Sequence, residues 1–214
     1  MARKNSLWIG IVLVIFIGAA GCAIPVREAV KVDTSVPVGT IEGNQFTGIR
    51  YPFKVAAPPG WKISTQYPEF MVDLGYDKAG LEESQVFIFN PGTQSNLQID
   101  FSPAGRYATF NQEKIEWLTT SATGTFKQEF EDQYGKEVPV TIAPTTAYPL
   151  KGVSFAAKKY AVYTAKGVKW EQGWIYGFTE PYQIFILYMA QEKEGTEDAA
   201  AIKQILDSFA VIHK

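Results

Sequence analysis

A run of six apolar residues near the end of the chain constrains the fold more than any other feature. Residues 184–189 read IFILYM, without one polar side chain that water would favour. An antiparallel strand with one face in solvent alternates apolar and polar residues, and this run does not. It therefore predicts a central strand over 183–190 that is covered on both faces, and hence a layered fold.

The segments before this run predict further antiparallel strands. Residues 168–178 alternate so that one face carries Trp170, Gln172, Trp174, Tyr176 and Phe178. A turn at 165–167 joins them to a predicted strand at 150–164, and Asn90-Pro91-Gly92 separates strands at 86–89 and 97–102. With a short strand near 53–57, the pattern indicates an antiparallel sheet of about six strands.

Two segments have helical spacing. Thr109 and Gln112 form a candidate capping box for a helix that Gly124 ends, and a strand is predicted to follow at 126–130. Near the C-terminus, Ile202, Ile205, Leu206 and Phe209 are spaced as one apolar helix face. Residues 65–84 and 131–149 are interpreted as mostly loop. The predicted class is α+β, with the sheet sandwiched between helices.

Two short motifs lie at the ends of this pattern: FKVAAPPGWK at 53–62 and ILDSF at 205–209. They are similar to the opening and the close of the domain of the PsbP-like superfamily, which the whole pattern resembles. The resemblance covers residues 45–212 and implies an antiparallel sheet between helices. The family includes PsbP, the Ran-binding Mog protein and exported bacterial proteins of the DcrB type. It implies no single activity, because fold alone does not determine function.

The N-terminus is typical of an exported lipoprotein. Arg3 and Lys4 precede an apolar stretch at 7–17, and small residues lead up to Cys22, as in a cleaved signal peptide. The sequence AAGC at 19–22 resembles a lipobox, which implies cleavage before Cys22 and its acylation by fatty acids such as palmitate. The alternative is an incidental free cysteine. Several acyl chains would anchor the protein stably in a membrane.

The predicted organisation has three parts. Residues 1–21 are a signal peptide, residues 22–44 a lipidated N-terminus and flexible tether, and residues 45–214 a single domain. Ala23 follows the cysteine where inner-membrane lipoproteins of Gram-negative bacteria usually carry Asp. If the source is Gram-negative, this favours the outer membrane, with the protein facing the periplasm.

Composition excludes several function classes. The chain has 20 Lys and Arg against 22 Asp and Glu, so the sequence predicts no nucleic-acid partner. One cysteine and one histidine, His213, leave no disulfide framework, His triad or multi-His metal site. We therefore expect the protein to bind no cofactor and no metal, and to have no enzymatic activity.

Two functions remain. The first is non-catalytic binding of a protein partner, or assembly, in the cell envelope. Aromatic residues of the two predicted loops are its candidate contacts, because loops commonly carry function: Tyr67, Phe70, Tyr76, Tyr134 and Tyr148. The alternative is a hydrolase of envelope material that uses Asp or Glu, with Asp100 and Glu171 as carboxylates on strand faces opposite the large apolar residues.

The aromatic residues at 170–178 leave a further alternative open. Trp170, Trp174, Tyr176 and Phe178 form either part of the core under a helix or an exposed platform on which a sugar or peptide stacks.

Overall fold

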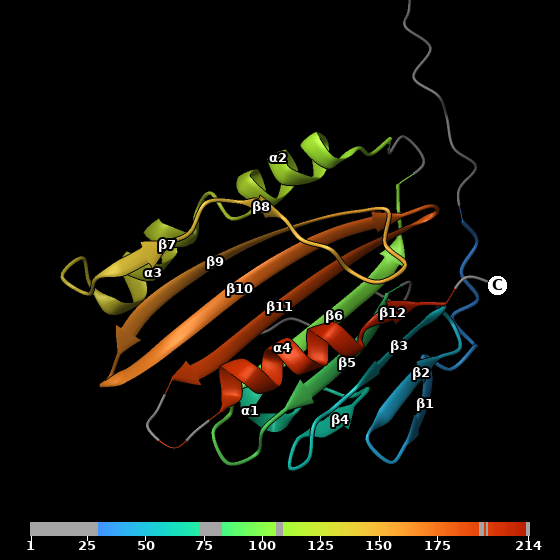
Figure 1. Ribbon diagram of the computed structural model, residues 1–214, viewed down its shortest axis with the longest axis horizontal. Coiled ribbons are helices and arrows are strands. Elements are labelled where there is room, and N and C mark those ends of the chain that lie inside the picture. Colours follow the sequence, from blue (N-terminus) through green and yellow to red (C-terminus); the bar gives the residue numbers. More distant parts are fainter. Residues whose placement is uncertain (1–29, 73–82, 106–108, 193–194, 196, 213–214) are drawn as a thin grey trace, which may run out of the picture.

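The computed structural model describes residues 30–72, 83–105, 109–192, 195 and 197–212. Its larger sheet is antiparallel, with strand order β4-β5-β6-β11-β10-β9-β7, and β8 pairs with β9 beside β7 (Figure 1). The strands are β4 (Lys62–Ser64), β5 (Ser84–Phe89), β6 (Asn96–Pro103), β7 (Val140–Ile142), β8 (Thr146–Ala147), β9 (Phe155–Ala165), β10 (Val168–Thr179) and β11 (Tyr182–Glu192).

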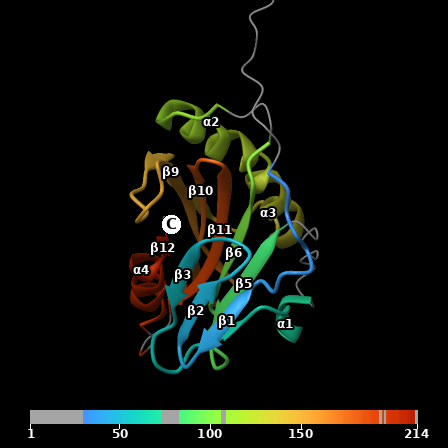
Figure 2. The ribbon, with the colours of Figure 1, turned by 90° about the vertical axis from the view of Figure 1, so that its right-hand side faces the viewer.

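A second, four-stranded antiparallel sheet has the order β1-β2-β3-β12. Its strands are β1 (Gly39–Glu42), β2 (Gln45–Gly48), β3 (Phe53–Ala56) and β12 (Ala210–Val211). The helices are α1 (Glu69–Val72), α2 (Gln112–Ala122), α3 (Phe126–Tyr134) and α4 (Asp198–Ser208). Figure 2 shows α4 on one side of the larger sheet and α1 and α3 on the other.

These elements confirm the antiparallel α+β class but change its proportions. The larger sheet has eight strands where about six were predicted, and the smaller sheet was not predicted as a separate unit. The helices cover the larger sheet only in part, so the arrangement is not a simple sandwich. The central strand is confirmed, because β11 lies between β6 and β10. Within the described residues, no helix has the length and apolar character needed to cross a membrane.

The prediction of a strand at 126–130 is wrong, because this segment forms α3. Phe126 and Phe130 lie one helical turn apart and their rings are in contact, with centroids 5.9 Å apart. Phe130 also packs on Tyr163 of β9 at 4.7 Å, so the helix buries a narrow apolar face. The preceding helix begins at Gln112, and its N-cap is Asn111, whose side chain accepts a hydrogen bond from the Lys114 amide, rather than Thr109.

The segments predicted as loops contain short elements. Helix α1 lies within 65–84, and β7 and β8 lie within 131–149. The long strand predicted from 150 begins later, at Phe155.

The folded part of the chain also starts earlier than the predicted boundary at residue 45. Strand β1 pairs with β2, and Val38 packs against the main core. The guanidinium of Arg50 donates hydrogen bonds to the carbonyl oxygens of Thr34 and Val36. At least residues 34–44 are therefore part of the folded structure. Residues 1–29, including Cys22, lie outside the described residues.

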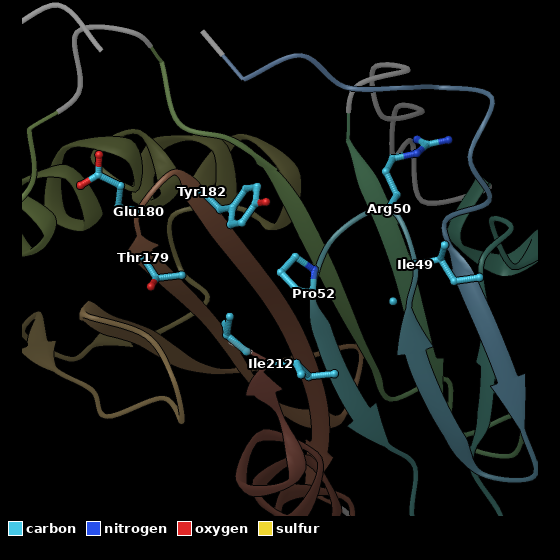
Figure 3. A pocket seen from close by; sticks show the side chains of 9 residues that line it. Ile49, Arg50, Pro52, Thr179, Glu180, Tyr182 and Ile212 are labelled. Atoms are coloured by element: carbon cyan, nitrogen blue, oxygen red, sulfur yellow. The ribbon is translucent and has the colours of Figure 1, made fainter. Parts of the chain in front are cut away.

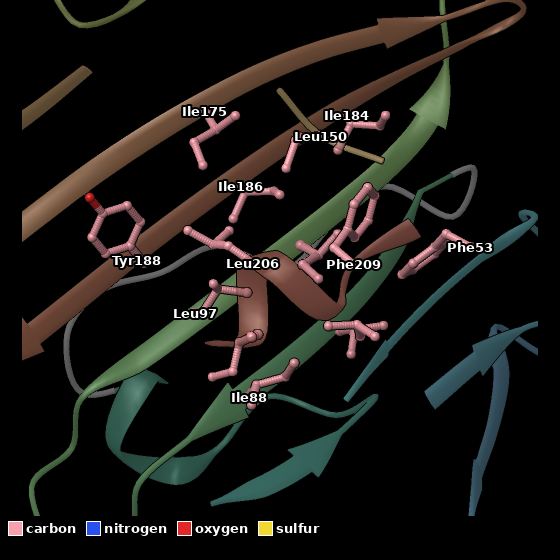
Figure 4. Close-up of a cluster of buried hydrophobic side chains, with 14 of the residues drawn as sticks. Phe53, Ile88, Leu97, Leu150, Ile175, Ile184, Ile186, Tyr188, Leu206 and Phe209 are labelled. Atoms are coloured by element: carbon pink, nitrogen blue, oxygen red, sulfur yellow. The ribbon is translucent and has the colours of Figure 1, made fainter. Parts of the chain in front are cut away.

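The main core lies between one face of the larger sheet, helix α4 and the smaller sheet. The predicted apolar face of the terminal helix is confirmed, since Ile202, Ile205 and Leu206 are all buried. Figure 4 shows Leu206 and Phe209 directed towards Ile184 and Ile186 of β11. The Phe53 ring stacks on Phe101 with a centroid distance of 4.9 Å, which joins the smaller sheet to the larger one.

The opposite face of the larger sheet is covered by α2 and α3, which lie over β9 and β10. The Trp174 ring packs on Phe126 at 4.7 Å, and Phe178 packs on Phe110 at 4.5 Å. Trp174 and Phe178 are therefore core residues rather than an exposed platform, whereas Trp170 and Tyr176 are half-buried. Next to Tyr176, on β11 and β6, the helical cover is incomplete.

Candidate binding groove between β6, β11 and helix α2

A cavity of about 340 Å³ lies where the helical cover is incomplete. We call it the β6–β11 groove. Its walls combine apolar, aromatic and polar groups: Glu83, Asp100, Ser102, Phe110, Ile115, Leu118, Tyr176, Gly177, Gln183, Ile184 and Phe185. Ligand sites in proteins are commonly cavities of about 300–1,000 Å³ that are mostly apolar with a few convergent polar groups. The groove has this character.

Strand register brings its central residues together. Asp100 of β6 lies opposite Phe185 of β11, and Phe185 lies opposite Tyr176 of β10. Because directly opposed residues share a face of the sheet, these three side chains form one row across three strands. A second row is formed by Ser102 and Gln183, which are also opposed, and the Gln183 amide donates a hydrogen bond to the Ser102 hydroxyl at 3.2 Å.

The apolar wall comes from aromatic residues and from α2. The rings of Tyr176 and Phe185 are in contact, with centroids 4.7 Å apart and planes inclined by 41°. Ile115 of α2 is buried, and Leu118 one turn along the helix is half-buried at the groove. Half-buried Tyr176, Phe185 and Phe110 are therefore the large rings that line the groove.

Asp100 is the electrostatic centre of the groove. Burial raises the pKa of its carboxyl to about 6, and the neighbouring Glu83 carboxylate raises it as well. Hydrogen bonds from Gln98, at 2.9 and 3.1 Å, and from Gln85 act in the opposite direction. The pKa lies above its ordinary value because desolvation of the charge outweighs these hydrogen bonds. Among the described lining residues, no side chain carries a positive charge.

Strand β6 carries, close to Asp100, buried side-chain oxygens that accept no hydrogen bond from a described residue. Gln98 is buried, and its amide donates to Asp100, but its own Oε1 accepts no hydrogen bond from a described residue. Oδ1 of Asn96, two residues earlier on β6, also accepts no hydrogen bond from a described residue. In the described part of the chain, no three His, Cys, Asp or Glu side chains are grouped as a metal site would require. Of these acceptors, the Asp100 carboxylate lines the groove, so its polar side is suited to a hydrogen-bond donor.

Asp100 and Glu171 each lie opposite the large apolar residues of their own strand, as predicted, but neither carboxylate is fully in solvent, since both are half-buried. Asp100 shares its face with Tyr176 and Phe185 of the neighbouring strands. Glu171 lies on the other face of the sheet, where it accepts a hydrogen bond from the Tyr188 hydroxyl at 2.5 Å and lies 3.8 Å from the Lys158 ammonium. The two carboxylates therefore do not form a pair. The second carboxylate near Asp100 is Glu83.

The loop aromatics proposed as partner contacts are not brought together. Tyr67 packs on Phe87 at 4.5 Å and Phe70 on Phe89 at 5.5 Å, both at β5. Two others lie elsewhere: Tyr134 on α3 beside Phe130, and Tyr148 beside Lys158 of β9. All four are half-buried. Tyr76 lies outside the described residues.

A larger cavity, of about 500 Å³, lies between the ends of the two sheets. Figure 3 shows its lining, with the Arg50 side chain extending away from Tyr182 and Glu180. The Arg50 guanidinium donates to the backbone carbonyls of Thr34, Val36 and Glu83. Because these bonds engage the guanidinium, we interpret Arg50 as fastening the N-terminal segment to the sheet rather than as a ligand contact.

Known proteins resemble this chain in their structures and not in their sequences. No family model matches the chain, and no curated protein matches it. Among solved structures, it is similar to cyanobacterial PsbP (CyanoP) from Synechocystis sp. PCC 6803, with TM-score 0.49 and 10% identity over 83% of this chain and 100% of that one. It is also similar to a protein from Bacteroides thetaiotaomicron, with TM-score 0.46 and 10% identity, covering 81% of this chain and half of the other.

Proposed function

We propose that the protein is a lipid-anchored binding protein of the cell envelope, with a PsbP-like domain that holds its ligand or partner in the β6–β11 groove without catalysis. The observation that carries this proposal is the mixed lining of the groove. Half-buried Tyr176 and Phe185 adjoin the half-buried carboxyl of Asp100 and the polar side chains of Ser102 and Gln183. Binding sites combine apolar contact area with a few oriented polar groups in this way.

The anchoring part of the proposal rests on Cys22 and the sequence around it. We expect Cys22→Ala to abolish acylation, since the thiol carries the lipid, and to release the protein from the membrane fraction or leave an uncleaved precursor. Fractionation and intact-mass measurement of the protein from its own cells test this. A mature N-terminus at another residue, without acyl mass, would contradict lipidation.

A second candidate function is Asp- or Glu-dependent hydrolysis of envelope material. Asp100, with a pKa near 6 and Glu83 beside it, favours this candidate, because carboxyl groups with raised pKa values are typical of general acids. The two candidates are separated by incubating the purified protein with peptidoglycan and other envelope polymers. Binding without cleavage supports the first function. Cleavage that is lost in Asp100→Asn establishes the second and rejects the first.

A further inference from the structure

The charge of Asp100 is not balanced by any described residue that lines the groove. The other charged lining group is Glu83, which has the same sign. A carboxylate removed from water is costly unless a positive charge or several donors compensate it. Gln98 and Gln85 donate hydrogen bonds to Asp100 but carry no charge, so above pH 6 the described lining of the groove holds negative charge without a positive side chain.

We propose that the β6–β11 groove binds an organic cation, namely a primary ammonium or guanidinium group on an apolar body. The cation lies against Asp100, and the apolar body lies along Tyr176, Phe185 and Leu118. This inference rests on the proposed function, since it takes the groove to be the binding site and names the class of ligand.

The chemistry of the lining agrees with such a ligand at each point. Ammonium and guanidinium groups donate hydrogen bonds and accept none, which suits a wall containing the Asp100 carboxylate and the Ser102 hydroxyl. Cations are also attracted to the faces of aromatic rings such as those of Tyr176 and Phe185. An anion would meet two carboxylates, and a hydrated metal ion would gain nothing from Ile115 and Leu118.

A matched set of small probes tests the inference on the full protein. We would titrate 4-phenylbutylammonium, 4-phenylbutanol and 4-phenylbutyrate at pH 7.5 and follow the backbone amide shifts of β6 and β11 by NMR. We expect the ammonium compound to bind at least about tenfold more tightly than the alcohol, as one close charge pair in a desolvated site provides. The carboxylate probe should bind most weakly.

Two variants assign the effect to Asp100. Asp100→Asn keeps the shape of the side chain and should bring the ammonium compound to the affinity of the alcohol. Asp132→Asn changes an exposed carboxyl on α3 and should leave the preference unchanged. A thermal midpoint that rises in Asp100→Asn at pH 7.5, and rises progressively less as the pH falls from about 6 towards 3.8, would show that the variant folds and that the ionised carboxyl destabilises the native state. The sign follows because a carboxyl whose pKa rises from 3.8 to about 6 on folding costs stability in full above about pH 6, and this cost disappears only below 3.8.

Binding should also depend on pH. Affinity for the ammonium compound should fall as the pH is lowered through about 6, where Asp100 gains a proton, whereas affinity for the alcohol should not change. In the described lining, the other titratable groups are Glu83 and Tyr176. Helix α2 and strand β11 contribute uncharged residues there: Ile115, Leu118, Gln183, Ile184 and Phe185.

The remaining outcomes would overturn the inference, each in a different way. Equal affinity for ammonium and alcohol, or an unchanged preference in Asp100→Asn, would reject the cation and leave the groove as a binding site. Tighter binding of calcium chloride at the same amides would assign a metal ion instead. If none of the probes shifts amides of β6 or β11, the inference and the groove's role in the proposed function both fail.

Discussion

Phe209→Ala is expected to lower the free energy of unfolding by about 3–5 kcal/mol. Phe209 directly follows α4 and is 1% exposed, with its ring 5.8 Å from that of Phe53. It lies where α4, the smaller sheet and the larger sheet meet, so removing the ring leaves a cavity that three elements would have to close together. Urea unfolding of the purified protein measures the effect.

Gln204→Ala is the matched control, because Gln204 is an exposed residue of the same helix. It should change stability by less than about 0.5 kcal/mol. A loss below about 1 kcal/mol for Phe209→Ala would show that α4 does not seal the core in the way described above.

Gly173→Ala should be the next most damaging of these changes, at about 1–3 kcal/mol. A Cβ atom at position 173 would lie 2.2 Å from the ring of Tyr188 on the neighbouring strand. That ring is held by the hydrogen bond from its hydroxyl to Glu171 and by the Lys158 ammonium, 5.0 Å from its centroid. Because the ring cannot swing aside without losing these contacts, the clash must be absorbed by the strands.

Gly177→Ala provides the comparison on the same strand and face. Its Cβ would approach Val153 Cγ1 at 3.2 Å, a contact that a small shift relieves, so the expected loss is below about 1 kcal/mol. A double-mutant cycle adds a second check, since Gly173→Ala should cost little in a Tyr188→Ala background. Equal losses for the two glycine variants would show that Tyr188 does not determine the requirement at position 173.

The elements predicted best from the sequence are those whose pattern is long and local. The terminal segment has four apolar residues at helical spacing, and all four are buried, although the fourth, Phe209, directly follows α4. The alternation at 168–178 correctly placed Trp174 and Phe178 on one face. Helix α3 was missed because residues 126–130 are too few to distinguish a helix from a strand. Its second apolar position, Phe130, is fixed by contact with Tyr163, more than thirty residues away.

The sequence predicted only part of the candidate groove, because most of its lining comes from other elements. Residues 97–102 alternate cleanly, so Gln98, Asp100 and Ser102 were correctly assigned to one face but expected to meet water. The side chains around Asp100 on that face come from β10 and β11 beside it and from α2 above it, and the local pattern carries no information about them. Glu83 was more accessible to prediction, because extending the β5–β6 pairing by one residue places it opposite Ser102.

The central claim is that the protein binds through the β6–β11 groove, and photocrosslinking in the cells of origin tests it most directly. One variant carries 4-azidophenylalanine in place of Phe185, in the groove, and the matched variant carries it in place of Trp117, 65% exposed and turned away from the sheet on α2. After irradiation, the intact mass of each purified protein reveals any covalent adduct. We predict one discrete adduct from position 185 and none from position 117. An adduct from position 117 alone, or none at position 185, would contradict the claim.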